Sequence, residues 1–155
     1  MGVLIRASTE RDIPAIAGLL DALNDAEGYS TRTDAQKLKH ALMDEGREVR
    51  LSALVAQSDD HVVGVLLYYP GYDTLSASVG YHLADMVVSV AHQRQGIGRM
   101  LVQALAKQTL NEQKEWISLT ALKRNTAARE FYLAMGMTQV EVDFFAIGRN
   151  ALAQL

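Results

Sequence analysis

The sequence has no cysteine among its 155 residues, and only two prolines and one tryptophan. Without cysteine the chain forms no disulfide scaffold, no thiolate metal site and no Cys nucleophile. The absence agrees with a cytoplasmic protein, which is the location we expect.

Long hydrophobic runs and blocks of like charge are also missing. The longest apolar run, residues 62–69, is too short to span a bilayer, and residues 3–5 are too few for the apolar part of a signal peptide. The formal net charge is −3, with no run of five or six basic residues. We therefore expect neither nucleic acid nor a membrane as a partner. The histidines lack metal-ligand spacing, so no metal site is expected.

What remains is the composition of an ordinary globular protein, 49% hydrophobic and 21% charged, and its length predicts one domain over residues 1–155. Periodicity and caps predict helices over residues 9–23, 33–44, 96–110 and 125–135, and strands over residues 3–7, 51–57, 62–69, 80–90, 116–122 and 140–147. Residues 24–32 form a polar connection, and Pro70-Gly71 is expected to end a strand before a loop over residues 72–78. The order predicts an α/β (α+β) fold with a mixed sheet of six to seven strands and about four flanking helices.

A turn with two glycines, between residues 87 and 101, organises the pattern. An apolar run stops, Gly96 and Gly98 follow in a short polar turn, and a helix begins at once. Glycine allows a tight turn close to a ligand, and the free N–H groups of a helix N-terminus favour a phosphate or pyrophosphate. Arg94 and Arg99 flank the turn and add positive charge.

Several interpretations of this turn compete. It is a plain turn before an ordinary helix, or it is a phosphate site. A dinucleotide-binding fingerprint requires a third glycine where Leu101 stands, and a nucleoside-triphosphate loop requires Gly-Lys-Ser/Thr where Gly98-Arg99-Met100 stands. The two familiar nucleotide loops are therefore excluded, while a generic phosphate site remains.

Two motifs resemble the GNAT superfamily of N-acetyltransferases. Residues 93–98, Gln-Arg-Gln-Gly-Ile-Gly, resemble its Gln/Arg-x-x-Gly-x-Gly/Ala signature. Residues 125–137 resemble its Asn-x-x-Ala-x-x-Phe-Tyr-x-x-x-Gly-Phe segment, and residues 5–12 resemble its first strand and helix. The resemblance covers essentially the whole chain, and it implies the single-domain fold of that superfamily.

The resemblance implies acetyl-CoA as co-substrate and Tyr132 as the general acid that protonates the CoA thiolate. Without the resemblance, Tyr132 is as well explained as a core aromatic and Asn125 as a helix cap. The implied cofactor contacts are Met86, Val87 and Val88 for the pantetheine arm; Gln93, Arg94, Gln95, Gly96, Ile97, Gly98 and Arg99 for the pyrophosphate; and Asn125 and Ala128.

Within the superfamily, residues 68–73 and 83–88 are most similar to the diamine and thialysine acetyltransferases. The substrate contacts that follow are Glu27, Tyr72, His82 and Asp85. Ala84 stands where these enzymes have a glutamate. Neighbouring strand residues face opposite sides, so Asp85 is not expected to replace it. His82 shares the face of Ala84 and is either the base or a half-exposed strand histidine.

The function expected from these residues is transfer of an acetyl group from acetyl-CoA to the primary amine of a small molecule. The transfer is expected to be direct, within a ternary complex. A non-catalytic acetyl-CoA-binding module and a protein or peptide amine acetyltransferase are the alternatives. A long loop over residues 72–78, closing on the site, favours the small substrate. A homodimer is expected by analogy with similar enzymes.

Overall fold

The computed structural model describes residues 2–155 and divides the chain into two compact units, which are described separately. The first ends at Thr120 and the second runs from Ala121 to Leu155. The first unit contains one five-stranded sheet in the order β1-β2-β3-β4-β5. Its strands are β1 (Val3–Ala7), β2 (Ser52–Ser58), β3 (His61–Asp73), β4 (Ser78–Val88) and β5 (Ile117–Leu119). Strands β1 to β4 are antiparallel, and β5 is parallel to β4.

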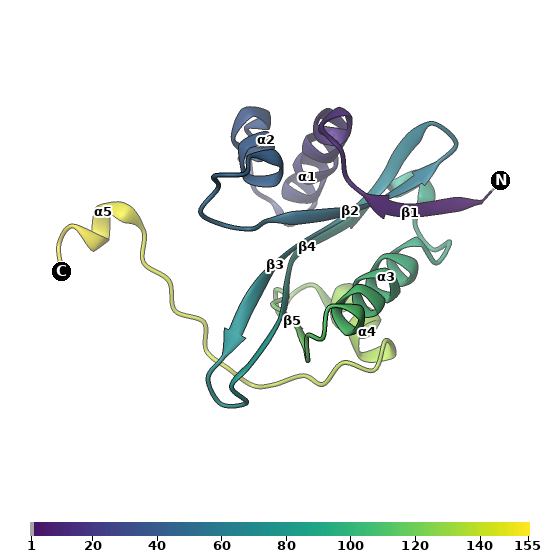
Figure 1. Cartoon of the computed structure of the whole chain (residues 1–155). Helices are drawn as coiled ribbons and strands as arrows, with labels where there is room; N and C mark the ends of the chain where they lie inside the picture. Colours follow the sequence, from purple (N-terminus) through teal and green to yellow (C-terminus); the bar gives the residue numbers. More distant parts are fainter. Residues whose placement is uncertain (1) are drawn as a thin grey trace. The chain divides into compact units, whose positions relative to one another are not determined.

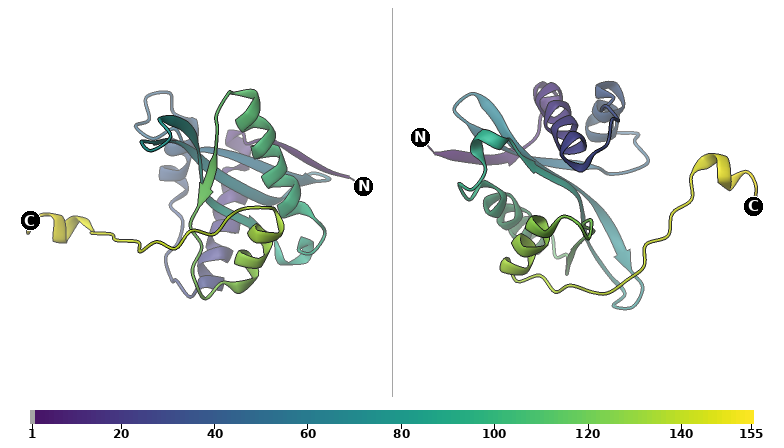
Figure 2. Two further views of the ribbon diagram at one scale, coloured as in Figure 1. Left: turned by 90° about the horizontal axis from the view of Figure 1, so that it is seen from below. Right: turned by 180° about the vertical axis from the view of Figure 1, so that it is seen from behind.

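Helices cover both faces of this sheet (Figure 1 and Figure 2). Helices α1 (Ile13–Glu27) and α2 (Ala35–Met43) lie on one face, here named the α1 face, and α3 (Ile97–Asn111) lies on the other, the α3 face. The core on the α1 face includes Ile16, Leu38 and Val65. On the α3 face, Gly64 meets Ile97, and the hydroxyl of Tyr68 donates to Gln108 Oε1 over 3.1 Å.

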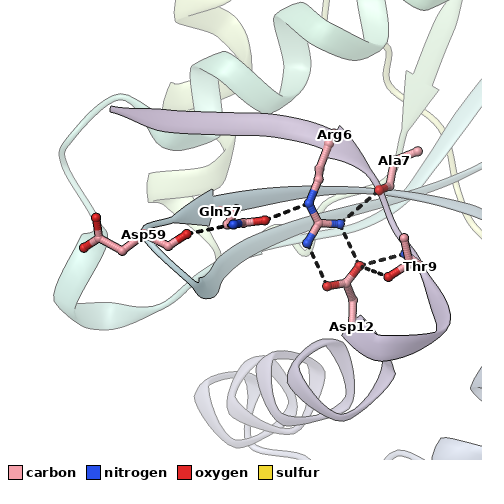
Figure 3. A network of polar contacts seen from close by, with 6 residues as sticks. All are labelled: Arg6, Ala7, Thr9, Asp12, Gln57 and Asp59. Carbon is pink, nitrogen blue, oxygen red and sulfur yellow. Dashed lines mark hydrogen bonds and ion pairs between the residues drawn. The ribbon is translucent and has the colours of Figure 1, made fainter. Parts of the chain in front are cut away.

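The start of α1 is tied to β1 by an ion pair (Figure 3). The guanidinium of Arg6 donates to both carboxylate oxygens of Asp12, over 2.7 and 2.9 Å. The same carboxylate accepts from the backbone N–H of Thr9 over 2.7 Å, which caps the 3-10 turn η1 (Glu10–Asp12) that leads into α1. This network links β1 to the turn that leads into α1.

Strand β4 contains a β-bulge in its middle. Leu67 pairs with Asp85 and Tyr68 pairs with Leu83, so Ala84 is an extra residue with no partner of its own on β3. Leu67 and Ala84 both belong to the core on the α1 face, and cross-strand partners share a face. Asp85 therefore faces the α1 side together with Ala84. The expectation that Asp85 faces away from Ala84 is wrong, because the bulge interrupts the alternation.

The hairpin of β3 and β4 is longer than expected. Strand β3 continues through Pro70-Gly71 to Asp73, so the expected break there is wrong. Strand β2 begins at Ser52, opposite Tyr68. Beyond that point no strand within residues 2–155 pairs with β3 on the β2 side, and a proline there costs no hydrogen bond to β2. The expected loop over 72–78 is also wrong, because only residues 74–77 form the turn.

Two paired glycines in this hairpin make room for Trp116. Gly71 and Gly80 are cross-strand partners. A Cβ on Gly80 would lie 2.0 Å from Trp116 Cδ2, and one on Gly71 would lie 3.0 Å from Trp116 Cη2. The backbone N–H of Tyr81 donates to the Trp116 carbonyl over 2.9 Å. The indole therefore fixes β5 against the hairpin, which only glycines permit.

The second unit contains α4 (Thr126–Ala134) and α5 (Arg149–Leu152). Helix α4 ends at Ala134 and is followed by the predicted stop, Gly136, with φ +89°. The strand expected over 140–147 is absent, so among residues 2–155 the sheet has five strands rather than six or seven. The alternating pattern predicts a strand, but a strand also requires a partner edge, and this segment pairs with no strand within residues 2–155.

Most other elements match their predicted positions to within two or three residues. The important exception is Glu27. The sequence predicts a polar connection at this position, but Glu27 is the last residue of α1, before Gly28 with φ +84°. No helix among residues 2–155 has the length and apolar character that crossing a bilayer requires.

Candidate functional site

The glycine turn leads from β4, through the 3-10 turn η2 (Val90–His92), into α3. Gly96 is the N-cap of α3 and has φ +82°, and Arg94 has φ +64°. These left-handed conformations fold the backbone so that the N–H groups of residues 94–99 meet no acceptor anywhere in residues 2–155. A run of free N–H groups at a helix N-terminus has the geometry that can bind an anion.

Side chains around the turn divide into two kinds. Gln93 and Gln95 brace it, because their amide groups donate to the carbonyls of Val88 (3.0 Å) and Ala91 (3.3 Å). Arg94 and Arg99 are exposed and have no acidic partner within the described part of the chain. The turn therefore offers backbone donors and two unpaired guanidinium groups to an anion.

The geometry limits what one predicted contact can offer a ligand and leaves three others accessible. Ile97 is 1% exposed and packs in the core, so only its N–H remains for a ligand. Met86, Val87 and Val88 lie where β4 has lost its outer neighbour, because β5 pairs only with Tyr81 to Leu83. Within the described residues no strand pairs with the outer edge of β4 there, and an extended molecule could pair with it as a strand would.

Two carboxylates lie near each other on the α1 face of β4. Asp85 is exposed in the bulge, and Glu27 ends α1 nearby. The loss of hydration among the surrounding protein atoms raises the pKa of Asp85, and the negative charge of Glu27 raises it further. Asp85 and Glu27 bring two negative charges together, and a bound cation would offset their repulsion. This pair can therefore bind an ammonium group and take a proton.

His82 lies on the same face, two residues before Ala84. Its Nδ1 is 3.1 Å from the hydroxyl oxygen of Ser118 on β5, and its ring centroid is 5.1 Å from that of Tyr69 on β3. Burial lowers the pKa of His82. The imidazole is thus kept neutral near pH 7, which is the form that accepts a proton.

Tyr72 is not brought to this cluster. It pairs with Val79 at the end of the hairpin and is 64% exposed, five positions along β3 from the partner of Asp85. The neighbouring acid, Asp73, uses its carboxylate to accept from the backbone N–H groups of Leu75 (3.2 Å) and Ser76 (3.0 Å). These residues build the hairpin turn.

The second unit contains the remaining predicted residues. Asn125 caps α4, since its Oδ1 accepts from the N–H of Ala128 over 3.1 Å. That N–H is therefore already engaged. Tyr132 lies two turns further along the helix and meets Phe131 edge-on, with ring centroids 5.1 Å apart. Asn125 can cap the helix through Oδ1 and contact a ligand through its amide nitrogen, so the two predicted roles are compatible.

Tyr69 and Ser118 are contacts of the site that the sequence did not reveal. Both touch His82 through the registers of β3–β4 and β4–β5, which no local pattern encodes. Nothing in the spacing of these residues could have identified them. Among residues 2–155 no three His, Asp or Glu side chains gather as metal ligands would.

Known proteins resemble this chain in sequence and in structure. L-ornithine N5-acetyltransferase NATA1 of Arabidopsis thaliana is 32% identical over 82 residues, which is 51% of this chain and 35% of that protein. The match therefore spans about a third of the length of this relative.

Solved structures share the fold. An aminoglycoside acetyltransferase from an uncultured soil metagenomic sample has a TM-score of 0.78 at 22% identity, over 95% of this chain and 97% of its own. The ribosomal-protein-alanine N-acetyltransferase of Brucella melitensis biovar Abortus 2308 has a TM-score of 0.77 at 22% identity, over 96% and 99%. The model of the acetyltransferase (GNAT) family matches residues 17–137, and the chain therefore belongs to the GNAT family of acetyltransferases.

Proposed function

We propose that this protein transfers an acetyl group from acetyl-CoA directly to the primary amine of a small molecule within a ternary complex. One observation carries the proposal. Strand β4 has an acidic pair, Asp85 with Glu27, on its α1 face and leads at its end into the anion site of residues 94–99. A cation site and an anion site on one strand suit an amine and a phosphorylated donor.

The residues fit the donor. Enzymes of this family use acetyl-CoA, which supplies the activated acetyl thioester when bound. The free N–H groups of residues 94–99 and the guanidinium groups of Arg94 and Arg99 match a pyrophosphate in charge and in hydrogen-bonding type. The open edge of β4 at residues 86–88 suits an extended arm, and its N–H groups are candidates to polarise the reacting carbonyl.

The acidic pair supports a cationic amine as acceptor. Glu27 and Asp85 bind the ammonium form, and an acceptor with a second positive charge gains from both carboxylates. The name of the Arabidopsis relative includes ornithine, an amino acid with two amino groups. Small basic amines are therefore the first class to assay.

The attacking amine must lose a proton, and two groups of the site can accept it. Asp85 has a raised pKa, so it takes up a proton more readily than an ordinary aspartate. His82 is neutral near pH 7 because its pKa is lowered. We propose Asp85 as the principal acceptor, because it shares the pair with Glu27. Tyr132 is proposed, from the family resemblance, as the acid for the leaving thiolate.

A protein or peptide amine is the second candidate. The loop expected to close over the site is only a turn at residues 74–77, so the argument from a closing loop against an extended substrate is removed. The two candidate substrates differ in the number of positive charges that they present to the acidic pair. A small dication uses both acids, whereas a peptide N-terminus uses one.

The test is acetyl-CoA-dependent thiol release with a panel of polyamines, ornithine, lysine analogues, aminoglycosides and short peptides. We expect turnover with a small basic amine, and loss of about a hundredfold or more in kcat/KM in Asp85→Asn, because general-base catalysis contributes about that much. Tyr132→Phe should lower kcat. Asp60→Asn, in the exposed β2–β3 turn, is the control. Turnover of no amine would favour the non-catalytic module, and preference for peptides would refute the small substrate.

A further inference from the structure

His82 lies in the middle of a row of three side chains that crosses the sheet. Its cross-strand partners are Tyr69 on β3 and Ser118 on β5. Such partners share a face of the sheet, so all three lie on the α1 face. The ring centroid of Tyr69 lies 5.1 Å from that of His82, and the hydroxyl oxygen of Ser118 lies 3.1 Å from His82 Nδ1. The imidazole is therefore in contact with a neighbour on each side.

The two ring nitrogens of His82 have different surroundings. Nδ1 lies beside the Ser118 hydroxyl, whereas no hydrogen bond to Nε2 is found within residues 2–155. A histidine nitrogen that takes up a proton needs a free lone pair, and the hydrogen bond at the other nitrogen decides which of the two has it. Nε2 is therefore the nitrogen open to a ligand, and the partner of Nδ1 determines whether Nε2 carries a proton or a lone pair.

A serine hydroxyl can accept from Nδ1–H or donate to Nδ1. If the hydroxyl of Ser118 donated, Nε2 would carry the proton and would offer an N–H to an ammonium group, which can itself only donate. If the hydroxyl oxygen accepts, Nε2 has a lone pair for an ammonium N–H. Ser118 is exposed, so its own proton can be donated to water. Only the second arrangement suits a cationic acceptor, and this step rests on the proposed function.

The charged groups on the α1 face leave His82 free to accept a proton. They are Asp85 on β4 and Glu27 at the end of α1, and the other neighbours of the ring are the phenol of Tyr69 and the hydroxyl of Ser118. Burial lowers the pKa of His82, and neither carboxylate reverses that shift. The ring is therefore neutral near pH 7, with one nitrogen able to take up a proton.

We propose that Ser118 is a positioning residue for proton transfer: its Oγ accepts from Nδ1–H of His82, so that Nε2 takes a proton from the acceptor amine. An ammonium nitrogen loses two protons on the way to an amide, so a second acceptor beside Asp85 has a use. In the step at His82, an N–H bond of the substrate breaks, an Nε2–H bond forms, and the substrate nitrogen keeps the electron pair. The charged ring is stabilised, because Nδ1–H then donates to Ser118 in a charge-assisted hydrogen bond.

The first experiment determines by ¹⁵N NMR which nitrogen of neutral His82 carries the proton. The wild type should carry it on Nδ1, Ser118→Ala should shift it toward Nε2, and Ser118→Thr, which keeps the hydroxyl, should resemble the wild type. The midpoint pH of the His82 titration should fall in Ser118→Ala, because the charged ring loses an acceptor. A wild-type ring protonated on Nε2, or a titration that Ser118→Ala leaves unchanged, would overturn the proposal.

Ser58→Ala is the matched control for this measurement. Ser58 on β2 and His61 on β3 are also a serine and a histidine that are cross-strand partners. They lie at the β2–β3 turn, and the substitution should leave the tautomer and the titration of His82 unchanged. A change in His82 of the same size in Ser58→Ala would show that the signals follow the sheet as a whole and not the hydroxyl of Ser118.

The second experiment measures acetyl transfer in a double-mutant cycle. Ser118→Ala should lower kcat roughly three- to tenfold, which is the effect of one hydrogen bond, with KM for the amine nearly unchanged. In a His82→Gln background the same substitution should have no effect, because a positioning residue acts only through the side chain that it positions. An equal loss in both backgrounds would refute the proposal. Failure to acetylate any amine would instead refute the proposed function, on which the NMR measurement does not depend.

Discussion

The ion pair between Arg6 and Asp12 gives the most quantitative test of how the first unit is held together (Figure 3). The Asp12 side chain is only 7% exposed and accepts from Arg6 and from Thr9. Chiefly because Arg6 hydrogen-bonds the charged form, the pKa of Asp12 falls from 3.8 to about 2. Replacing Asp12 by asparagine removes this charge while keeping the shape of the side chain.

The magnitude follows from linkage. A pKa lowered from 3.8 to about 2 contributes about 2 kcal/mol to the free energy of unfolding, at about 1.4 kcal/mol per unit. Since the folded pKa is the lower one, this contribution is complete above about pH 4 and is lost as the pH falls through 2. Asp12→Asn should therefore lose about 2 kcal/mol at pH 7, which lowers Tm by roughly 4–8 °C in a chain of this size.

The assay is urea unfolding of both proteins between pH 7 and pH 2, followed by circular dichroism. The difference between wild type and Asp12→Asn should be constant from pH 7 to pH 5 and should shrink below pH 4. Asp60→Asn, in the exposed β2–β3 turn, should match the wild type throughout. A difference that is the same at pH 2 and pH 7 would show that packing, and not the ionised carboxylate, accounts for the effect.

Three further changes test the hairpin, a helix cap and the anion site. Gly80→Ala should cost about 3 kcal/mol in unfolding free energy, because its Cβ would overlap Trp116 at 2.0 Å, whereas Gly71→Ala, at 3.0 Å from the ring edge, should cost about 1. Asp34→Ala should cost about 1 kcal/mol, because Asp34 accepts from two N–H groups at the start of α2. Arg99→Gln should raise KM for acetyl-CoA about tenfold at low salt and less at high salt, with kcat unchanged; an unchanged KM would contradict the pyrophosphate site.

Local patterns predict helices and their ends correctly. The helical spacing of α3, the cap at Asp34 and the stop at Gly136 each depend on residues within one or two turns of each other. Such signals need no knowledge of the fold. The glycine turn predicts an anion site from the same kind of local signal, since Gly96 and the helix behind it are adjacent in the sequence; that site stays a prediction.

Features that depend on pairing were predicted badly. Pro70-Gly71 predicts the end of a strand, because the sequence does not say that β2 stops opposite Tyr68 and leaves the proline at an edge. The alternation over residues 140–147 predicts a strand, because it does not indicate whether a partner strand is present. In both cases the deciding fact is the register or the extent of a neighbouring strand.

The bulge at Ala84 changes how the substrate pattern should be compared. When the sequences are compared position by position, Ala84 stands where the pattern has a glutamate, so the substrate site would lack that carboxylate. By geometry, the extra residue in β4 places Asp85 on the same face as Ala84 and His82, against Glu27. A carboxylate is therefore present on the face where the pattern expects one, but it comes from the next position along the chain. Residues of a bulged strand should be matched by the face they occupy, and on that basis Ala84 is no evidence against catalysis.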